Sequence, residues 1–152
     1  MELLIMENNL VNEMKVCLAT AFSFYLKAHN FHWNVEGPNF PQYHSLFEAI
    51  YSDVWGSVDA IAEHIRTLGA YAPGSFTRYH AISLVKEEQM VLTPHKMIND
   101  LIADNDTIIT QLKKTCKLAE SSGDVGIANF LQDRIDTHAK HGWMLKSTSK
   151  VL

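Results

Sequence analysis

The sequence predicts an all-α protein: a four-helix bundle with one short extra helix in the long connection between its second and third long helices. Apolar residues recur at spacings of three and four in four long segments, and no segment alternates apolar and polar residues as a strand does. Glycine, proline or serine separates these segments. With 152 residues, 47% of them hydrophobic, the chain has the size of one globular unit, and we expect a single domain over residues 1–152.

The first helix is predicted over residues 9–35 and the second over about 39–68. The turn at Gly37–Pro38 ends the first helix, because glycine readily takes the left-handed capping conformation and proline cannot continue a helix. Pro41 fits the first turn of the second helix, where its missing N–H has no partner to lose, and Gly69 follows the end. The inward face of the first helix is predicted to contain Leu10, Met14, Leu18, Ala21, Tyr25, Ala28 and His32.

Residues 70–92 are predicted to form the long connection, because a proline and a glycine interrupt them and only one short helix fits. Thr93–Pro94 marks the start of the third long helix, whose apolar period continues to about Glu120. The stretch "SSGD" breaks that period, and Asp124 is predicted to cap the last helix. The inward face of the last helix is predicted to contain Ile127, Leu131, Ile135 and His138.

Composition excludes several classes of protein. The formal net charge of -4 argues against a general polyanion binder, because nucleic-acid affinity depends on Lys and Arg neutralising phosphates. Glu2 and Glu7 stand where a signal peptide would carry positive charge, and no apolar run approaches the roughly 18 residues of a membrane span. Cys17 and Cys116 are far apart and lie in helical patterns, which indicates reduced core thiols. We therefore expect a soluble, cytoplasmic protein.

The second helix carries two clusters of side chains that commonly bind metals. Relative to His44, the residues Glu48, Asp59 and Glu63 lie about 40°, 60° and 100° around the helix axis, so all four share one face. Along the axis, however, Glu48 and Asp59 are about 16 Å apart. One helix therefore cannot bring both clusters to one metal.

A second copy of the chain resolves this separation. The two clusters are symmetric about a point between Asp53 and Val54, so two antiparallel copies of the helix would set each cluster level with the other cluster of the partner. Ser52 and Gly56 are small enough to let the helices approach, and Trp55 supplies area to bury. The predicted dimer has two identical sites, each with His32, His44 and Glu48 from one subunit and Asp59 and Glu63 from the other. Two imidazoles and three carboxylates suit iron(II), manganese or zinc.

Each of these residues also has a simpler interpretation. A single histidine on an apolar face is more often a hydrogen-bonded core residue than a ligand, which applies to His32. Glu63 has Arg66 within reach for an exposed ion pair, and Glu48 and Asp59 fit a solvated face. The joint occurrence on one face, with symmetric spacing, favours the metal site.

Two stretches resemble a known family. The run "HNFHWNVEGPNFPQYHSLFEAIYSDVWGSVDAIAEHIRTLG" closely resembles the signature of the Dps family, the starvation DNA-protection proteins or mini-ferritins, and "FLQDRIDTHAKHGWML" resembles the last helix of that family. The long connection permits the crossover topology of ferritin-like bundles, although its length alone does not establish it. The resemblance implies four-helix subunits assembled into hollow dodecamers. It also implies ferroxidase sites at the dimer two-folds, which oxidise iron(II) with hydrogen peroxide or oxygen and store iron(III) mineral. The Glu-x-x-His pairs of an intramolecular di-iron bundle are absent from the sequence, which argues against a full-size ferritin.

The resemblance carries over to individual residues. His32, His44, Asp59 and Glu63 match the ferroxidase ligands of the family, whereas Glu48 stands where aspartate is usual, so its carboxylate is displaced by one methylene. Trp33 resembles the tryptophan beside the family's site, which intercepts oxidising equivalents; simple packing is the alternative. Iron uptake in the family uses acid-lined three-fold pores near the start of the last helix, for which Asp124 and Asp133 are candidates, although helix capping explains Asp124 equally well.

DNA binding is expected to be weak or absent. The chain has no basic residue before Lys15, and its C-terminal "KSTSKVL" offers only two lysines, whereas DNA-binding members often use basic tails. The cluster "QLKKTCK" is more often a solvated helix face. The leading prediction is thus an oligomeric ferroxidase and iron store. The alternatives are a nucleoid protein that protects DNA by coating it, and a helical scaffold with a degenerate or zinc-filled site.

Overall fold

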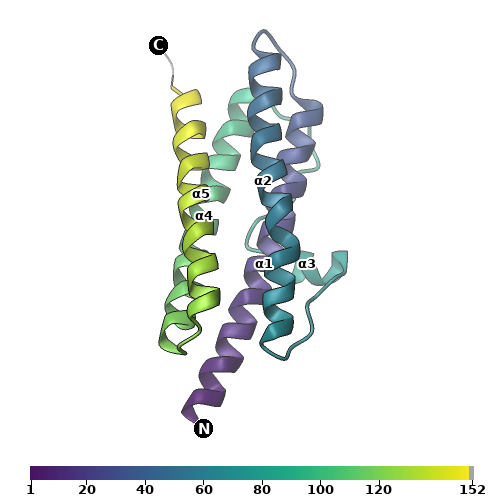
Figure 1. The fold of residues 1–152 in the computed structure, drawn as a ribbon. Coiled ribbons are helices and arrows are strands. Elements are labelled where there is room, and N and C mark those ends of the chain that lie inside the picture. The colour runs from purple at the N-terminus through teal and green to yellow at the C-terminus, as the bar shows by residue number, and fades with distance from the viewer. Residues whose placement is uncertain (151–152) are drawn as a thin grey trace.

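The computed structural model describes residues 1–150, apart from the side chains of residues 3–7, and contains five helices and no strand in that part. The helices are α1 (Glu2–Asn34), α2 (Phe40–Thr67), α3 (Phe76–Ile82), α4 (Pro94–Ser121) and α5 (Val125–Thr148) (Figure 1). This arrangement confirms the predicted all-α four-helix bundle with a short helix in the long connection.

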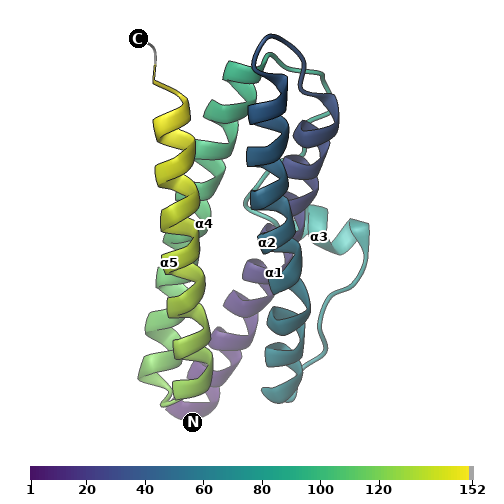
Figure 2. The same cartoon turned by 45° about the horizontal axis from the view of Figure 1, so that its top comes forward.

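The long connection determines the topology. α1 packs antiparallel against α2, α4 packs antiparallel against α5, and α1 joins the two pairs by packing against α4 (Figures 1 and 2). The segment between α2 and α4 returns along the length of the bundle, with α3 lying against α1, so α2 and α4 run in the same direction. The structure therefore has the crossover that the long connection permitted.

The predicted helix boundaries are confirmed except at the N-terminus. Thr93 Oγ1 accepts a hydrogen bond from the backbone N–H of Lys96 at 3.3 Å, and Asp124 Oδ1 accepts one from the N–H of Ile127 at 3.0 Å, as N-caps do. α1 begins at Glu2 rather than near residue 9. The acidic Glu2 in the first turn suits the positive end of the helix dipole, and an apolar period does not reveal this signal.

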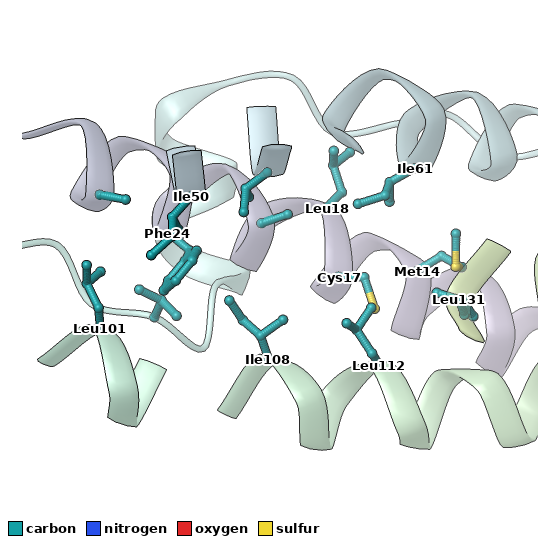
Figure 3. Packing of buried hydrophobic residues seen from close by; sticks show 14 of the residues in the cluster. Met14, Cys17, Leu18, Phe24, Ile50, Ile61, Leu101, Ile108, Leu112 and Leu131 are labelled. Atoms are coloured by element: carbon teal, nitrogen blue, oxygen red, sulfur yellow. The ribbon is translucent and has the colours of Figure 1, made fainter. Parts of the chain in front are cut away.

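The core lies between the four long helices (Figure 3). Phe24, Phe31 and Phe47 are fully buried, and burial of each such side chain contributes about 1.5–3 kcal/mol relative to exposure. Figure 3 labels buried residues that pack together in this core: Met14, Cys17, Leu18, Phe24, Ile50, Ile61, Leu101, Ile108, Leu112 and Leu131. Cys17 and Cys116 are free and buried, as predicted, and burial raises the pKa of the Cys17 thiol to about 11.

Two features differ from the predicted inward faces. On α1 Tyr25 is only half-buried, and on α5 Ile135 is half-buried while its neighbour Arg134 is buried.

Among the helices described, none combines the length and apolar character needed to cross a bilayer.

Candidate metal centre

The turn between α1 and α2 brings His32 and His44 together. Their rings stack with centroids 3.6 Å apart and an interplanar angle of 17°. His32 Nδ1 donates to the backbone carbonyl of His44, and His44 Nδ1 donates to the carbonyl of His32, both at 2.8 Å. Because a carbonyl oxygen only accepts, each Nδ1 carries a hydrogen and each Nε2 of the neutral ring keeps a free lone pair. A backbone hydrogen bond that fixes tautomer and orientation is the usual support of a metal-binding histidine.

The three carboxylates of the predicted site lie on the free face of α2. Glu48, Asp59 and Glu63 are exposed, and within the described part of the chain none of them forms a hydrogen bond or an ion pair. The Glu63–Arg66 ion pair, which was the simpler alternative for Glu63, is not formed. Arg66 Nη1 instead donates to the carbonyl of Ala70 at 3.0 Å, and its guanidinium lies 4.6 Å from the centroid of the Tyr71 ring. The face that carries the carboxylates therefore points away from the core in a single chain.

One chain does not assemble the whole predicted site. Among the described side chains, those of residues 1–2 and 8–150, no three His, Cys, Asp or Glu groups gather closely enough to hold a metal ion. His32 and His44 meet at one end of α2, whereas Asp59 lies about 16 Å along the helix axis from Glu48. The structure thus joins the two histidines and leaves the Asp59–Glu63 pair apart.

Between the two carboxylate clusters, the same face of α2 is open. Trp55 is 53% exposed, and Ser52 is also exposed. A Cβ added at Gly56 would meet no atom within 4 Å, so the fold of this chain does not require glycine there. Glycine in a helix interior is destabilising by roughly 0.5–1 kcal/mol relative to alanine. A requirement outside the chain, such as the close approach of another helix, explains its presence better.

Two aromatic rings beside the histidine pair, those of Tyr51 and His29, were not predicted from the sequence, whereas Trp33 was. Tyr51 stands edge-on to His32 with centroids 5.0 Å apart, and it stacks on His29 at 3.8 Å. Trp33, 57% exposed, lies on the other side of His29 at 3.8 Å. Burial, followed by the nearby His32, lowers the pKa of His29. His29 precedes His32 by one helical turn, a spacing that would have indicated their proximity.

Comparisons with known proteins agree with the fold. A family model described as the ferritin-like domain matches residues 12–152. The chain is 32% identical over 123 residues to DNA protection during starvation protein 2 of Bacillus anthracis, covering 81% of this chain and 84% of the relative. The structure of Dps from Thermosynechococcus elongatus superposes with a TM-score of 0.97 at 28% identity, covering 100% of this chain and 97% of the other.

The chain belongs to the Dps family of ferritin-like proteins. Two further proteins are similar to this chain. Antigen TpF1 of Treponema pallidum is 36% identical over 127 residues, covering 83% of this chain and 72% of the antigen. The Dps protein of Vibrio cholerae, described as a member of a broad superfamily of ferritin-like diiron-carboxylate proteins, superposes with a TM-score of 0.91 at 29% identity over 96% of this chain and 92% of that one.

This Dps chain also contains a buried polar network on the inner side of α2. Arg134 of α5 donates to both carboxylate oxygens of Asp53 at 3.0 and 2.8 Å, and His141 Nε2 donates to Asp53 Oδ2 at 2.7 Å. Arg134 also donates to His138 Nε2 at 3.2 Å, and His138 Nδ1 donates to Asn105 Oδ1 of α4 at 2.8 Å. The network therefore links α2, α4 and α5.

The charges of the network follow from these partners. Although burial opposes ionisation, the hydrogen bonds from His141 and Arg134 hold the pKa of Asp53 well below its ordinary value. Burial, reinforced by the adjacent Arg134, lowers the pKa of His138 to about 3, so this imidazole is neutral. Neutral His138 is also what the hydrogen bonds require, because its Nε2 accepts from Arg134.

Proposed function

We propose that this Dps-family chain stores and detoxifies iron, and that it is a ferroxidase that oxidises iron(II) with hydrogen peroxide at sites completed by two subunits. One subunit contributes His32, His44 and Glu48, and its partner contributes Asp59 and Glu63. The observation that carries the proposal is the exposed face of α2, where three carboxylates without partners in the described chain lie in symmetric clusters beside two oriented imidazoles.

The residues of this proposed site have complementary roles toward iron(II), which is a substrate here. The reciprocal hydrogen bonds of His32 and His44 present two Nε2 lone pairs without any rearrangement. The carboxylates supply the negative charge and hard oxygen ligands that iron(II) accepts alongside imidazole. Peroxide would take electrons from iron held by these groups rather than from iron in solution.

Glu48 is the departure from the family pattern that this site must accommodate. Its side chain is exposed and has one methylene more than the usual aspartate, so the carboxylate has a longer reach and more rotamers. It keeps the charge, and we propose that it holds iron more loosely than aspartate would. Replacement Glu48→Asp should then raise the affinity of the apo protein for iron(II), measured by anaerobic titration.

The proposed assembly follows from the same face. Trp55 and Gly56 leave room and apolar area for an antiparallel copy of α2, and a two-fold contact is reciprocal by construction. We propose a homo-oligomer built from such dimers, with the family's dodecamer as its final form. For iron uptake, exposed Asp133 is a better candidate than Asp124, because one oxygen of Asp124 already caps α5.

Anaerobic iron loading tests the function and the ligands together. Apo protein is mixed with iron(II), peroxide is added, and iron(III) absorbance is followed for the wild type, Asp59→Ala and His32→Ala. We expect each variant to lose at least about 10-fold in rate, the lower limit for loss of an outer-shell partner of a metal. Asp106→Ala, which removes an exposed carboxylate paired with Lys146, is the matched control and should match the wild type. Equal rates in all variants would show that the ligands are wrongly assigned.

A DNA-coating function is less well supported. The name "DNA protection" belongs to relatives, whereas this chain has a net charge of -4. Of the clustered lysines on α4, Lys114 is paired with Glu13 at 2.8 Å, which leaves Lys113 and Lys117 as exposed basic groups. We propose weak DNA binding that disappears at moderate salt. Gel shifts at two salt concentrations test this, and complexes that resist salt would favour the coating function.

A further inference from the structure

A series of three oxidisable rings runs from His32 to the free face of α2. Tyr51 lies edge-on to His32 with centroids 5.0 Å apart. Tyr25 follows at 6.3 Å from Tyr51, and Trp55 lies 4.8 Å from Tyr25. The rings alternate between α1 and α2, because Tyr51 and Trp55 are one turn apart on α2 while Tyr25 faces the gap between them from α1. Beyond Trp55 the neighbouring ring is Phe22, at 6.4 Å, which is much harder to oxidise.

The series ends where the proposed partner would lie. Trp55 is 53% exposed and lies about 20° around α2 from His44, on the same face as the carboxylates. In the antiparallel pair, Trp55 and the partner's Trp55 would be offset by only about 4.5 Å along the axis. Packed helices have axes about 8–10 Å apart, so either indole would reach the other chain. The ring series of the two subunits would therefore meet at the two-fold axis.

Electron counting gives this series a function. Reduction of hydrogen peroxide to water requires two electrons, whereas iron(II) supplies one. A site that holds a single iron(II) would therefore reduce peroxide by one electron and release hydroxide and a hydroxyl radical. A phenol or an indole close to the site can supply the missing electron together with its proton.

We propose that Tyr51, Tyr25 and Trp55 form an electron-transfer path that joins the two metal sites of a dimer, an inference that rests on the function proposed above. In the first step iron(II), the Tyr51 phenol, peroxide and one proton give iron(III), a tyrosyl radical and two waters. The radical then takes a hydrogen atom equivalent from Tyr25, and Tyr25 takes one from the Trp55 indole. Finally, iron(II) in the partner site, with one proton, restores the indole and becomes iron(III). The sum is two iron(II), one peroxide and two protons giving two iron(III) and two waters.

The hydrogen-bonding of Tyr25 suits this role. Its Oη is hydrogen-bonded to Nδ1 of His29 at 3.2 Å, so the phenolic proton has a partner close by when the ring is oxidised. Trp33, in contrast, contacts His29 but is not part of the series that leads to Trp55. Substitutions in the path therefore test it independently of any role of Trp33.

The test uses the assembled apo protein loaded anaerobically with one iron(II) per subunit, followed by limiting peroxide. The readouts are iron oxidised per peroxide, hydroxyl radical captured by a spin trap, and the protein radical seen by freeze-quench electron paramagnetic resonance. In the wild type we expect two iron oxidised per peroxide, little trapped radical and a transient Tyr or Trp signal. In Tyr51→Phe, Tyr25→Phe and Trp55→Phe the iron oxidised per peroxide should fall toward one, trapped hydroxyl radical should rise several-fold and the transient signal should weaken.

Matched controls remove the same groups elsewhere. Tyr71→Phe removes an exposed phenol over Arg66, and Trp143→Phe removes an exposed indole of α5. Both should behave as the wild type. Size-exclusion chromatography checks that Trp55→Phe still assembles; if it does not, Tyr25→Phe, whose half-buried ring packs within one chain, decides the matter.

The outcomes separate this inference from the proposed function. If the wild type fails to oxidise iron, the function is wrong and the path falls with it. If the wild type oxidises iron while all three path variants give the same ratio and trapped radical as Tyr71→Phe, the function stands and the path is overturned.

Discussion

The two sides of α2 both carry carboxylates, but the inner carboxylate is hydrogen-bonded within the described part of the chain and the outer ones are not. On the inner side, Asp53 is held by Arg134 and His141, and each side chain of that network has a partner. On the outer side, Asp59 and Glu63 have none within the described chain. Carboxylates satisfied within one chain contribute to its stability, whereas carboxylates left free on one face are available to a ligand or partner from outside. The two sides should therefore respond differently to mutation.

The largest difference is expected when Arg134 is replaced. Arg134→Met leaves Asp53 charged and without its bidentate partner, which should lower the free energy of unfolding by about 3 kcal/mol. We take the lower end of the range for a broken buried pair because the Asp53 side chain is 30% exposed. Asp59→Ala on the outer side should change the free energy of unfolding of the apo protein by less than about 0.5 kcal/mol. Urea unfolding at fixed protein concentration measures both. A comparable loss in both variants would contradict the distinction between the sides.

The sequence predicted the outer side better than the inner side. Helical period alone placed Glu48, Asp59 and Glu63 on one face, because residues of one helix keep a fixed angular relation. The assignment of these residues as iron ligands remains a prediction. The pairing of Asp53 with Arg134 could not be predicted, because it joins residues 81 positions apart and depends on how α5 packs against α2.

Features that depend on neighbouring residues in the chain were predicted better than contacts between helices. The caps at Thr93 and Asp124 were predicted, since a capping side chain bonds a backbone N–H only three residues ahead. The contact between Tyr51 and His32 was missed, because it arises where two helices meet and nothing in the sequence of either helix alone indicates it.

Two glycines provide a smaller contrast, one buried in the core on α5 and the other on the outer side of α2. A Cβ at Gly142 of α5 would lie 2.9 Å from Nδ2 of Asn105, which is buried and held by His138, so Asn105 has little freedom to move. Gly142→Ala should therefore destabilise the protein by about 1–3 kcal/mol through overpacking. Gly56→Ala has open space and should instead stabilise the isolated helix by roughly 0.5–1 kcal/mol.

Gly56→Ala should nevertheless weaken the proposed dimer, because a methyl group would stand between the two copies of α2. Urea unfolding measures the first effect, and analytical ultracentrifugation over a range of protein concentrations measures the second. If Gly56→Ala associated as tightly as the wild type, the close approach of two α2 helices at this point would be wrong.

The last effect concerns the dependence of stability on pH. Burial lowers the pKa of His138 to about 3, whereas in the unfolded chain histidine titrates near its ordinary value of about 6.5. Between these two values the unfolded state binds more protons than the folded state, so the stability gained by keeping His138 neutral is present above about pH 6.5 and is lost as the pH falls. From about pH 7 to pH 5.5 this group should lower the free energy of unfolding by roughly 1 kcal/mol. His138→Gln lacks the titrating ring, so its unfolding free energy, measured by urea titration at each pH, should fall less steeply than that of the wild type. If the unfolding free energies of the two proteins fell in parallel with pH, His138 would not titrate with the lowered pKa. The acid sensitivity of the network would then come from Asp53. Because the pKa of Asp53 is depressed, its contribution to stability disappears only at lower pH.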